Sequence, residues 1–143
     1  MSEFQKASIR YKIYQDRNLL VDVIENHVRL EDLRDVFFSE SSDPDFIHVH
    51  KALTNAVNAD PGLSVNELQT LIPMLQLSDQ KTGFRWAILT DKPKQTTMSM
   101  LIKKDPYFRH IIGVFTTLAA CNSFLHLTFD ESEFNDADYK KLV

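Results

Sequence analysis

The chain has 143 residues, of which 43% are hydrophobic and 25% are charged, and its formal net charge is −4. This length fits one domain that buries its own core, and the acidic balance excludes the basic face that nucleic-acid binding requires. A single cysteine excludes an internal disulfide and any zinc site built from a pair of cysteines.

Neither the start of the chain nor its most apolar stretch predicts a targeting or membrane segment. The first residues lack the basic start and the apolar run of a signal peptide. Residues 110–129 carry no Asp, Glu, Lys or Arg, but they hold several polar side chains. They divide better into a strand and a helix than into one spanning helix. We therefore expect a cytoplasmic protein without a membrane partner.

The N-terminal segment predicts a β-hairpin. Ile9, Tyr11 and Ile13 alternate with polar or amphipathic residues, which is the period of a half-exposed strand. Residues 19–24 form a second, apolar run, and residues 16–18 supply turn chemistry between the two.

A helix and a third strand follow the hairpin. Leu30, Leu33 and Phe37 are spaced three and four residues apart, which predicts a helix that ends before Ser41. The third strand is expected within residues 46–56, in the second half of that range.

The clearest local signal is the start of the next helix. Ser64 and Glu67 have the spacing of a capping box, in which each side chain accepts a hydrogen bond from the backbone amide of the other. Leu63 and Leu68 occupy the hydrophobic staple positions around it. Pro73 should kink or end this helix just before its own position, because proline lacks an amide hydrogen and clashes with the preceding turn.

The remainder continues the alternation of strands and helices. We expect a helix closed by Pro106 and a last helix capped by Thr116 or Thr117. Cys121 lies on the inward face of that last helix, where it is a small buried residue rather than a nucleophile. The expected elements are strands 85–90 and 111–115 and helices around 98–102 and 118–125. The order ββαβαβαβα predicts an α/β fold with a five-stranded mixed sheet and about four helices.

This pattern resembles SpoIIAA-like proteins, which belong to the STAS class of bacterial regulatory domains. The resemblance is carried by the hairpin "YKIYQDRNLLVDVIENHVRLEDL", the turn "DPDF" and the ending "GVFTTLAACNSFL". It covers residues 8–127 of a single domain, 1–143, and leaves residues 128–143 as an acidic C-terminal extension. It implies a small non-enzymatic domain that binds proteins or nucleotide-like or lipid-like ligands.

The family's phosphorylation switch does not carry over to this chain. In the antagonist members a serine in the turn after the third strand is phosphorylated. Here residues 53–59 read LTNAVNA, with neither serine nor glycine, and Thr54 is a weak substitute.

No motif assembles a catalytic or metal site. The chain has three glycines and no nucleophile elbow or phosphate-binding loop. His48 and His50 would point to the same side of a strand, but a metal site would need a third ligand such as His110 or Asp45. We therefore expect no enzyme activity, no cofactor and no metal.

The stretch "LTDKPKQTT", residues 89–97, follows a strand and begins a helix. Thr90 or Asp91 would be the N-cap, with Pro93 in the first turn. The free amides, together with Lys92 and Lys94, could hold an anion. A plain helix start is the simpler interpretation, because the cap and the proline each remove one amide.

This loop should lie at the same end of the sheet as the turn after the third strand. We therefore expect a docking face made of Asn55, Asn58, Asp60, Asp91, Lys92, Lys94 and Thr96. The leading hypothesis is a regulatory or protein-interaction module with a protein partner. The alternative is a carrier of a small ligand, a lipid or nucleotide, held between helices and sheet. A small anionic ligand and a homodimer both stay open.

The C-terminal residues 130–143 place acids before lysines, an order that suits a helix dipole. Phe134 and Leu142 could anchor such a helix, and disorder is the alternative.

Overall fold

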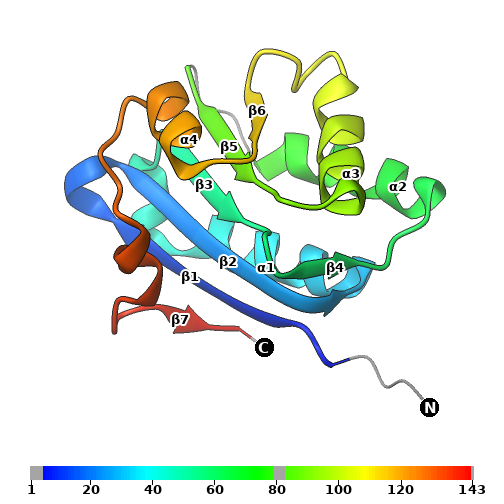
Figure 1. Cartoon of the computed structure of the whole chain (residues 1–143), viewed down its shortest axis with the longest axis horizontal. Helices are drawn as coiled ribbons and strands as arrows, with labels where there is room; N and C mark the ends of the chain where they lie inside the picture. Colours follow the sequence, from blue (N-terminus) through cyan, green and yellow to red (C-terminus); the bar gives the residue numbers. More distant parts are fainter. Residues whose placement is uncertain (1–4, 79–82, 143) are drawn as a thin grey trace.

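The computed structural model describes residues 5–78 and 83–142, which form a mixed sheet with helices on both faces (Figure 1). The strand order is β6-β5-β3-β2-β1-β7, and β4 pairs with β2 off this path. The strands are β1 (Ser8–Tyr14), β2 (Leu19–Val28), β3 (Lys51–Asn55), β4 (Ala59–Pro61), β5 (Arg85–Leu89), β6 (Ile112–Phe115) and β7 (Lys140–Lys141). The strands β2, β3, β5 and β6 run parallel, while β1 is antiparallel to both β2 and β7.

The N-terminal hairpin forms as expected. β1 and β2 pair from Ser8 opposite Glu25 to Tyr14 opposite Leu19. The connection is a single 3-10 turn, η1 (Gln15–Arg17), followed by Asn18 at φ 52°. Asparagine tolerates this left-handed conformation better than most residues, so the sequence of the turn matches its geometry.

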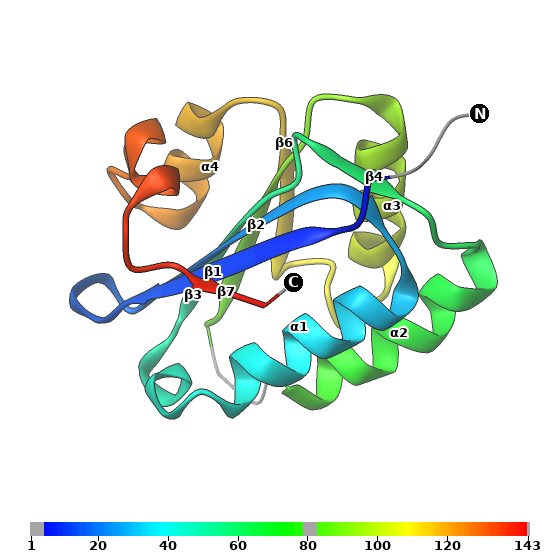
Figure 2. The same ribbon diagram turned by 90° about the horizontal axis from the view of Figure 1, so that it is seen from below.

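Three helices cover one face of the sheet and the fourth covers the other (Figure 2). The α-helices are α1 (Leu30–Ser42), α2 (Val65–Ser78), α3 (Pro93–Lys104) and α4 (Leu118–Leu125). α1, α2 and α3 pack on one apolar cluster, whereas α4 packs on a second cluster. β2 lies between them, and residues 19–24 are buried throughout. A strand covered on both faces reads as a continuous apolar run.

The described part of the chain has seven strands rather than the expected five. The two extra strands are the shortest, β4 and β7, and neither has the alternating pattern by which strands are recognised. They form because tertiary contacts bring them beside β2 and β1 respectively.

Two helix ends differ from expectation. α2 does not end before Pro73 but continues to Ser78. Pro73 is exposed, while Leu68, Leu71 and Leu75 are buried on the opposite side. A helix tolerates the lost hydrogen bond best on its solvent side, and core packing on both sides of the proline holds the helix together. α1 also runs past Ser41 to Ser42.

The C-terminal segment is ordered but does not form an α-helix. It contains a 3-10 turn, η3 (Glu131–Asn135), and β7, which lies along β1 (Figure 1). Phe134 is buried, so its expected anchoring role is confirmed. Within the described ranges no helix is long and apolar enough to cross a membrane.

Candidate functional site

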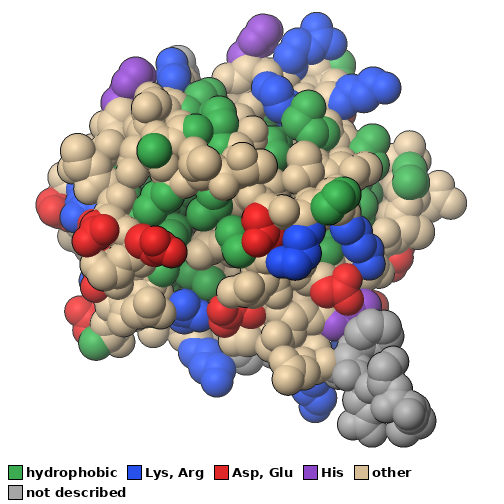
Figure 3. Space-filling view, in the orientation of Figure 1, with side chains coloured by type: hydrophobic (Ala, Val, Ile, Leu, Met, Phe, Trp, Pro, Cys, Tyr) green, Lys and Arg blue, Asp and Glu red, His purple; other side chains and the backbone are tan. Residues whose placement is uncertain are grey.

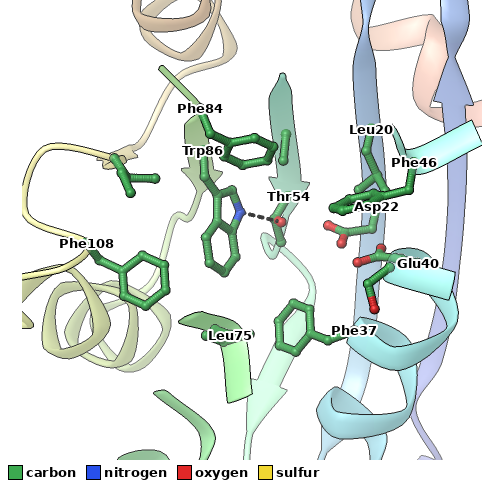
Figure 4. Close-up of a pocket in the computed structure, with 13 residues that line it drawn as sticks. Leu20, Asp22, Phe37, Glu40, Phe46, Thr54, Leu75, Phe84, Trp86 and Phe108 are labelled. Atoms are coloured by element: carbon green, nitrogen blue, oxygen red, sulfur yellow. Dashed lines mark hydrogen bonds between the residues drawn. The ribbon is translucent and has the colours of Figure 1, made fainter. Parts of the chain in front are cut away.

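A pocket of about 60 Å³ lies between the sheet and helices α1 and α2 (Figure 4). Aromatic side chains form much of its wall: Phe37, Phe46, Phe84, Trp86 and Phe108. Some wall residues, such as Ser41 and Ile111, are only half-buried. The pocket therefore has an aromatic interior with a partly exposed rim.

Two acidic side chains, Asp22 and Glu40, face each other in this pocket (Figure 4). Asp22 is 2% exposed and Glu40 is 4% exposed. Asp22 belongs to β2, where alternation directs Leu20 and Asp22 toward α1 and directs Val21 toward α4. Glu40 lies one helical turn after the buried Val36, on the inward side of α1.

One oxygen of each carboxyl has no partner. Asp22 Oδ1 and Glu40 Oε2 are both buried and make no hydrogen bond. Buried polar atoms in folded proteins are nearly always hydrogen-bonded, because an unsatisfied one costs about 1–3 kcal/mol. Two unsatisfied oxygens in the same pocket therefore require an explanation.

A short hydrogen-bond relay orients the Asp22 side chain. Trp86 Nε1 donates to Thr54 Oγ1 over 2.9 Å (Figure 4). The indole N–H is a donor only, so the Thr54 hydroxyl keeps its own hydrogen to donate to Asp22. Thr54 and Asp22 are direct partners on neighbouring parallel strands, which fixes this contact.

Burial and mutual repulsion make this pair retain a proton. Burial raises the pKa of Asp22, while hydrogen bonds from Glu40 and Thr54 act in the opposite direction. Burial also raises the pKa of Glu40 well above its ordinary value, and the neighbouring Asp22 raises it further. Two neighbouring carboxyls in a dry site cannot both ionise at low cost. Glu40 therefore keeps its proton and donates a hydrogen bond to Asp22.

The pair can accept hydrogen bonds, hold a cation or exchange a proton with a bound molecule. Of the described residues that line the pocket, none is Lys, Arg or His. A negative charge on the pair would therefore have no protein counter-ion within the described pocket wall.

A second pocket of about 90 Å³ lies beside the first, between α1, α2, α3 and the sheet. Its wall is largely apolar and shares Phe37, Thr54 and Trp86 with the first pocket. The rings of Phe37 and Trp86 meet edge to face at 6.0 Å. These two side chains therefore stand between the two spaces.

Four of the residues expected in the docking face, Asp60, Asp91, Lys92 and Lys94, lie where the start of α3 meets the segment after β3. Lys94 Nζ lies 2.9 Å from Asp60 Oδ1 in β4, and Lys92 Nζ donates to the carbonyl of Val57 over 3.1 Å. Hydrogen bonds from Lys94 and then His27 hold the pKa of Asp60 below its ordinary value. Positive and negative side chains lie side by side in the right-hand centre of Figure 3. The face is consequently close to neutral in charge.

The predicted N-cap of α3 is wrong. Lys92 occupies that position, and neither Thr90 nor Asp91 caps the helix. Instead Gln95 Oε1 accepts hydrogen bonds from the amides of Asp91 and Lys92. The Thr90 hydroxyl is buried against that of Thr96 at 2.8 Å, which removes it from the cap.

Gln95 also joins this helix start to the segment after β3. Its Nε2 donates to the carbonyls of Val57 and Ala59, each over 2.8 Å. The amides of Asp91 and Lys92 and the ammonium groups of Lys92 and Lys94 are thus already engaged within the protein. This arrangement favours the helix-start interpretation over the anion site.

The histidine geometry also differs from expectation. His48 ends a 3-10 turn, η2 (Pro44–His48), and His50 precedes β3, so they do not share a strand face. Both are exposed. Across residues 5–78 and 83–142, no three metal-binding side chains gather.

Cys121 is fully buried in α4, as expected. Burial raises the pKa of its thiol to about 11. Thr117 caps this helix by accepting from the amide of Ala120, which confirms one of the two predicted caps.

Asp22 and Glu40 belong to none of the motifs recognised in the sequence. A signal for Asp22 was present, because it is the one charged residue inside the apolar run 19–24. Glu40 follows Leu33 and Phe37 at helical spacing, which places it on the inward face. An acidic residue at a position that the hydrophobic pattern assigns to the core is unusual and therefore informative.

A scan against protein-family models gives no match, and a search of curated proteins gives none either.

Proposed function

We propose that this protein binds a small molecule in the pocket that contains Asp22 and Glu40. The observation that carries the proposal is the pair of buried, unpartnered oxygens, Asp22 Oδ1 and Glu40 Oε2. A bound molecule that donates hydrogen bonds to both would remove the cost of burying them. The proposal keeps the ligand between helices and sheet, as in the alternative hypothesis from the sequence, but with a smaller molecule in place of the lipid or nucleotide.

The shape and chemistry of the pocket support this function. Ligand sites are typically concave and apolar, with a few convergent polar groups that set orientation. Here the polar groups include two carboxyls and the hydroxyls of Ser41 and Thr54, surrounded by aromatic rings. The pocket volumes of about 60 and 90 Å³ suit a ligand of few heavy atoms. For comparison, an apolar cavity of about 150 Å³ holds benzene.

The regulatory module expected from the sequence is a second proposal, in which the chain is a cytoplasmic, SpoIIAA-like, STAS-class bacterial domain with a protein partner. The N-terminal hairpin followed by alternating helices and parallel strands supports it. So do the contacts of Lys92 with Asp91 and of Lys94 with Asp60, in which both lysine side chains are 60% exposed; the proposed docking face adds Asn55, Asn58 and Thr96 to these four residues.

The ligand proposal is tested on natively purified protein. Mass spectrometry of the extracted protein, together with ligand-observed NMR against small amines, alcohols and acids, would detect a bound molecule. The Ala52→Leu variant fills part of the first pocket and should lose that binding. Binding that is equal in the wild type and in this variant would place the ligand elsewhere.

The docking proposal has a separate test. Changing Lys92 and Lys94 to glutamate should release a co-purifying partner and leave the fold intact. Lys141→Glu is the control, because Lys141 is exposed on β7, which pairs with β1 and lies away from this face. A partner retained by the Lys92/Lys94 variant would exclude this face.

A further inference from the structure

We propose that the ligand of this pocket is a small organic amine, bound as its ammonium ion with its apolar part directed toward Trp86. This inference rests on the proposed function and names the chemical class of its ligand. It follows from the charge, the donor count and the wall of the pocket.

The charge of the pocket calls for a cation. Burial in a largely apolar site raises the pKa of both Asp22 and Glu40, and a cation beside them would favour the ionised form of the pair. Neither carboxyl forms an ion pair with any Lys, Arg or His of the described chain. Buried charges in proteins are normally paired, because an uncompensated one costs several kcal/mol. A cationic ligand would supply the missing charge.

The free oxygens match the donors of an ammonium group. Asp22 Oδ1 and Glu40 Oε2 are two acceptors in one pocket, and a primary ammonium carries three N–H donors. An alcohol offers a single donor, so it would leave one oxygen unsatisfied and the charge unpaired. A carboxylate ligand would be repelled.

A metal ion fits these groups less well. Calcium requires six to eight oxygen ligands, and magnesium requires six in near-octahedral geometry. The pocket supplies two carboxyls and the hydroxyls of Ser41 and Thr54, both already hydrogen-bonded within the protein, and the other described side chains around them are almost all apolar. Aromatic rings, by contrast, favour organic cations through cation–π attraction. Phe37 and Phe46 lie beside the carboxyl pair in Figure 4.

The aromatic wall of the first pocket receives the apolar part of the ligand. Phe37 and Trp86 line this pocket and meet edge to face at 6.0 Å. An alkyl chain attached to the ammonium can therefore pack against Trp86. Burial of each methylene contributes about 0.8 kcal/mol.

The test uses three probes of equal chain length: n-butylamine, 1-butanol and butyrate. The chain has a single tryptophan, Trp86, and it lies in the wall of both pockets. Its fluorescence therefore reports binding, and thermal shift gives an independent measure because a ligand stabilises the state that it binds. We expect n-butylamine to bind about tenfold or more tightly than 1-butanol, since a hydrogen-bonded charge contributes at least that much. Butyrate should not bind.

A variant locates the source of this selectivity. The double change Asp22→Asn and Glu40→Gln keeps the shape of the pocket and removes its charge. It should weaken n-butylamine about tenfold or more and bring it level with 1-butanol. Asp35→Asn, at an exposed position of the same helix, should leave both affinities unchanged. If the double variant does not fold, the ranking of the three probes on the wild type still decides the inference.

The outcomes separate this inference from the proposed function. Equal or tighter binding of 1-butanol in the wild type overturns the amine assignment but leaves a small-molecule site. Selective n-butylamine binding that survives the double change also overturns it, because the cation is then held elsewhere. Failure of every probe, combined with an empty natively purified protein, overturns the proposed function itself.

Discussion

Lys140 Nζ lies 2.6 Å from Asp43 Oδ2, although 97 residues separate the two side chains in the sequence. The same oxygen accepts from the hydroxyl of Tyr11 over 2.7 Å, and Asp43 Oδ1 accepts from the amide of Asp45. Asp43 is 8% exposed. One carboxylate therefore joins the C-terminal strand β7, the first strand β1 and the turn η2, which carries Phe46 of the pocket wall.

The first prediction concerns this junction. Asp43→Asn should lower the free energy of unfolding by about 2 kcal/mol, because the variant loses charge-assisted hydrogen bonds at a buried position. Urea denaturation measures the change. Asp138→Asn, whose side chain is 86% exposed, is the matched control and should have little effect.

The contribution of Asp43 should also depend on pH. Burial alone would raise the pKa of Asp43, but the hydrogen bonds from Lys140, Asp45 and Tyr11 hold it below the ordinary value. A lowered folded-state pKa means that the stabilisation is present above the unfolded pKa of about 4 and is lost as the pH falls through the folded value. The Asp43→Asn variant should consequently lose less stability on acidification than the wild type. Parallel acid-unfolding curves for the two proteins would contradict this account.

The second prediction concerns Glu40 and has the opposite sign. Burial and Asp22 raise the pKa of Glu40 in the folded protein. Below the unfolded-state pKa of about 4.3 the carboxyl is protonated in both states, and its burial costs no stability through charge. As the pH rises through the folded-state pKa, the buried carboxyl must ionise and the protein loses stability. Glu40→Gln should therefore gain stability relative to the wild type as the pH rises from about 4 to 9.

Melting temperatures measured across that range would test this prediction. Asp35→Asn, exposed on the same helix, should show no such trend. A Glu40→Gln protein that becomes steadily less stable than the wild type toward high pH would mean that Glu40 is ionised and paired in the native state.

The third prediction concerns the capping box of α2. Ser64 Oγ accepts from the amide of Glu67 over 3.1 Å, and Glu67 Oε1 accepts from the amide of Ser64 over 3.0 Å. Ser64→Ala should destabilise the protein by about 1 kcal/mol, because an amide at the helix start loses its acceptor. Asn66→Ala, two residues further and also exposed, should cost less. Equal midpoints for both variants in chemical denaturation would argue against the cap.

The fourth prediction concerns Cys121. A fully buried thiol with a raised pKa is protected from both contact and ionisation. A thiol reagent such as dithionitrobenzoate should react with the native protein only as fast as it unfolds, and at once in denaturant. Rapid modification of the folded protein would show that α4 opens locally.

Short-range signals in the sequence predicted the elements whose causes are local. The hairpin turn at Asn18, the box at Ser64 and the cap at Thr117 all depend on residues within a few positions of one another. Backbone preference and side-chain capping act over that distance. The loops that follow β3 and β5 were also expected to meet, since neighbouring parallel strands end at the same end of the sheet.

Tertiary structure decided the features that depend on contacts distant in sequence. The apolar run of residues 19–24 did not reveal that Asp22 would stand against Glu40, because that contact requires the pairing of β2 with β3 and the packing of α1 on top. The same reason explains why Gln95 displaced the expected cap, since its amide reaches the carbonyls of Val57 and Ala59. It explains the shortest strand as well, because two residues at Lys140 form β7 only where β1 offers an unpaired edge. The sequence by itself thus determined where most helices and strands begin, through local free energies. Which buried polar groups meet was determined by packing, because a low-dielectric interior makes the energy of a polar group depend on its spatial neighbours.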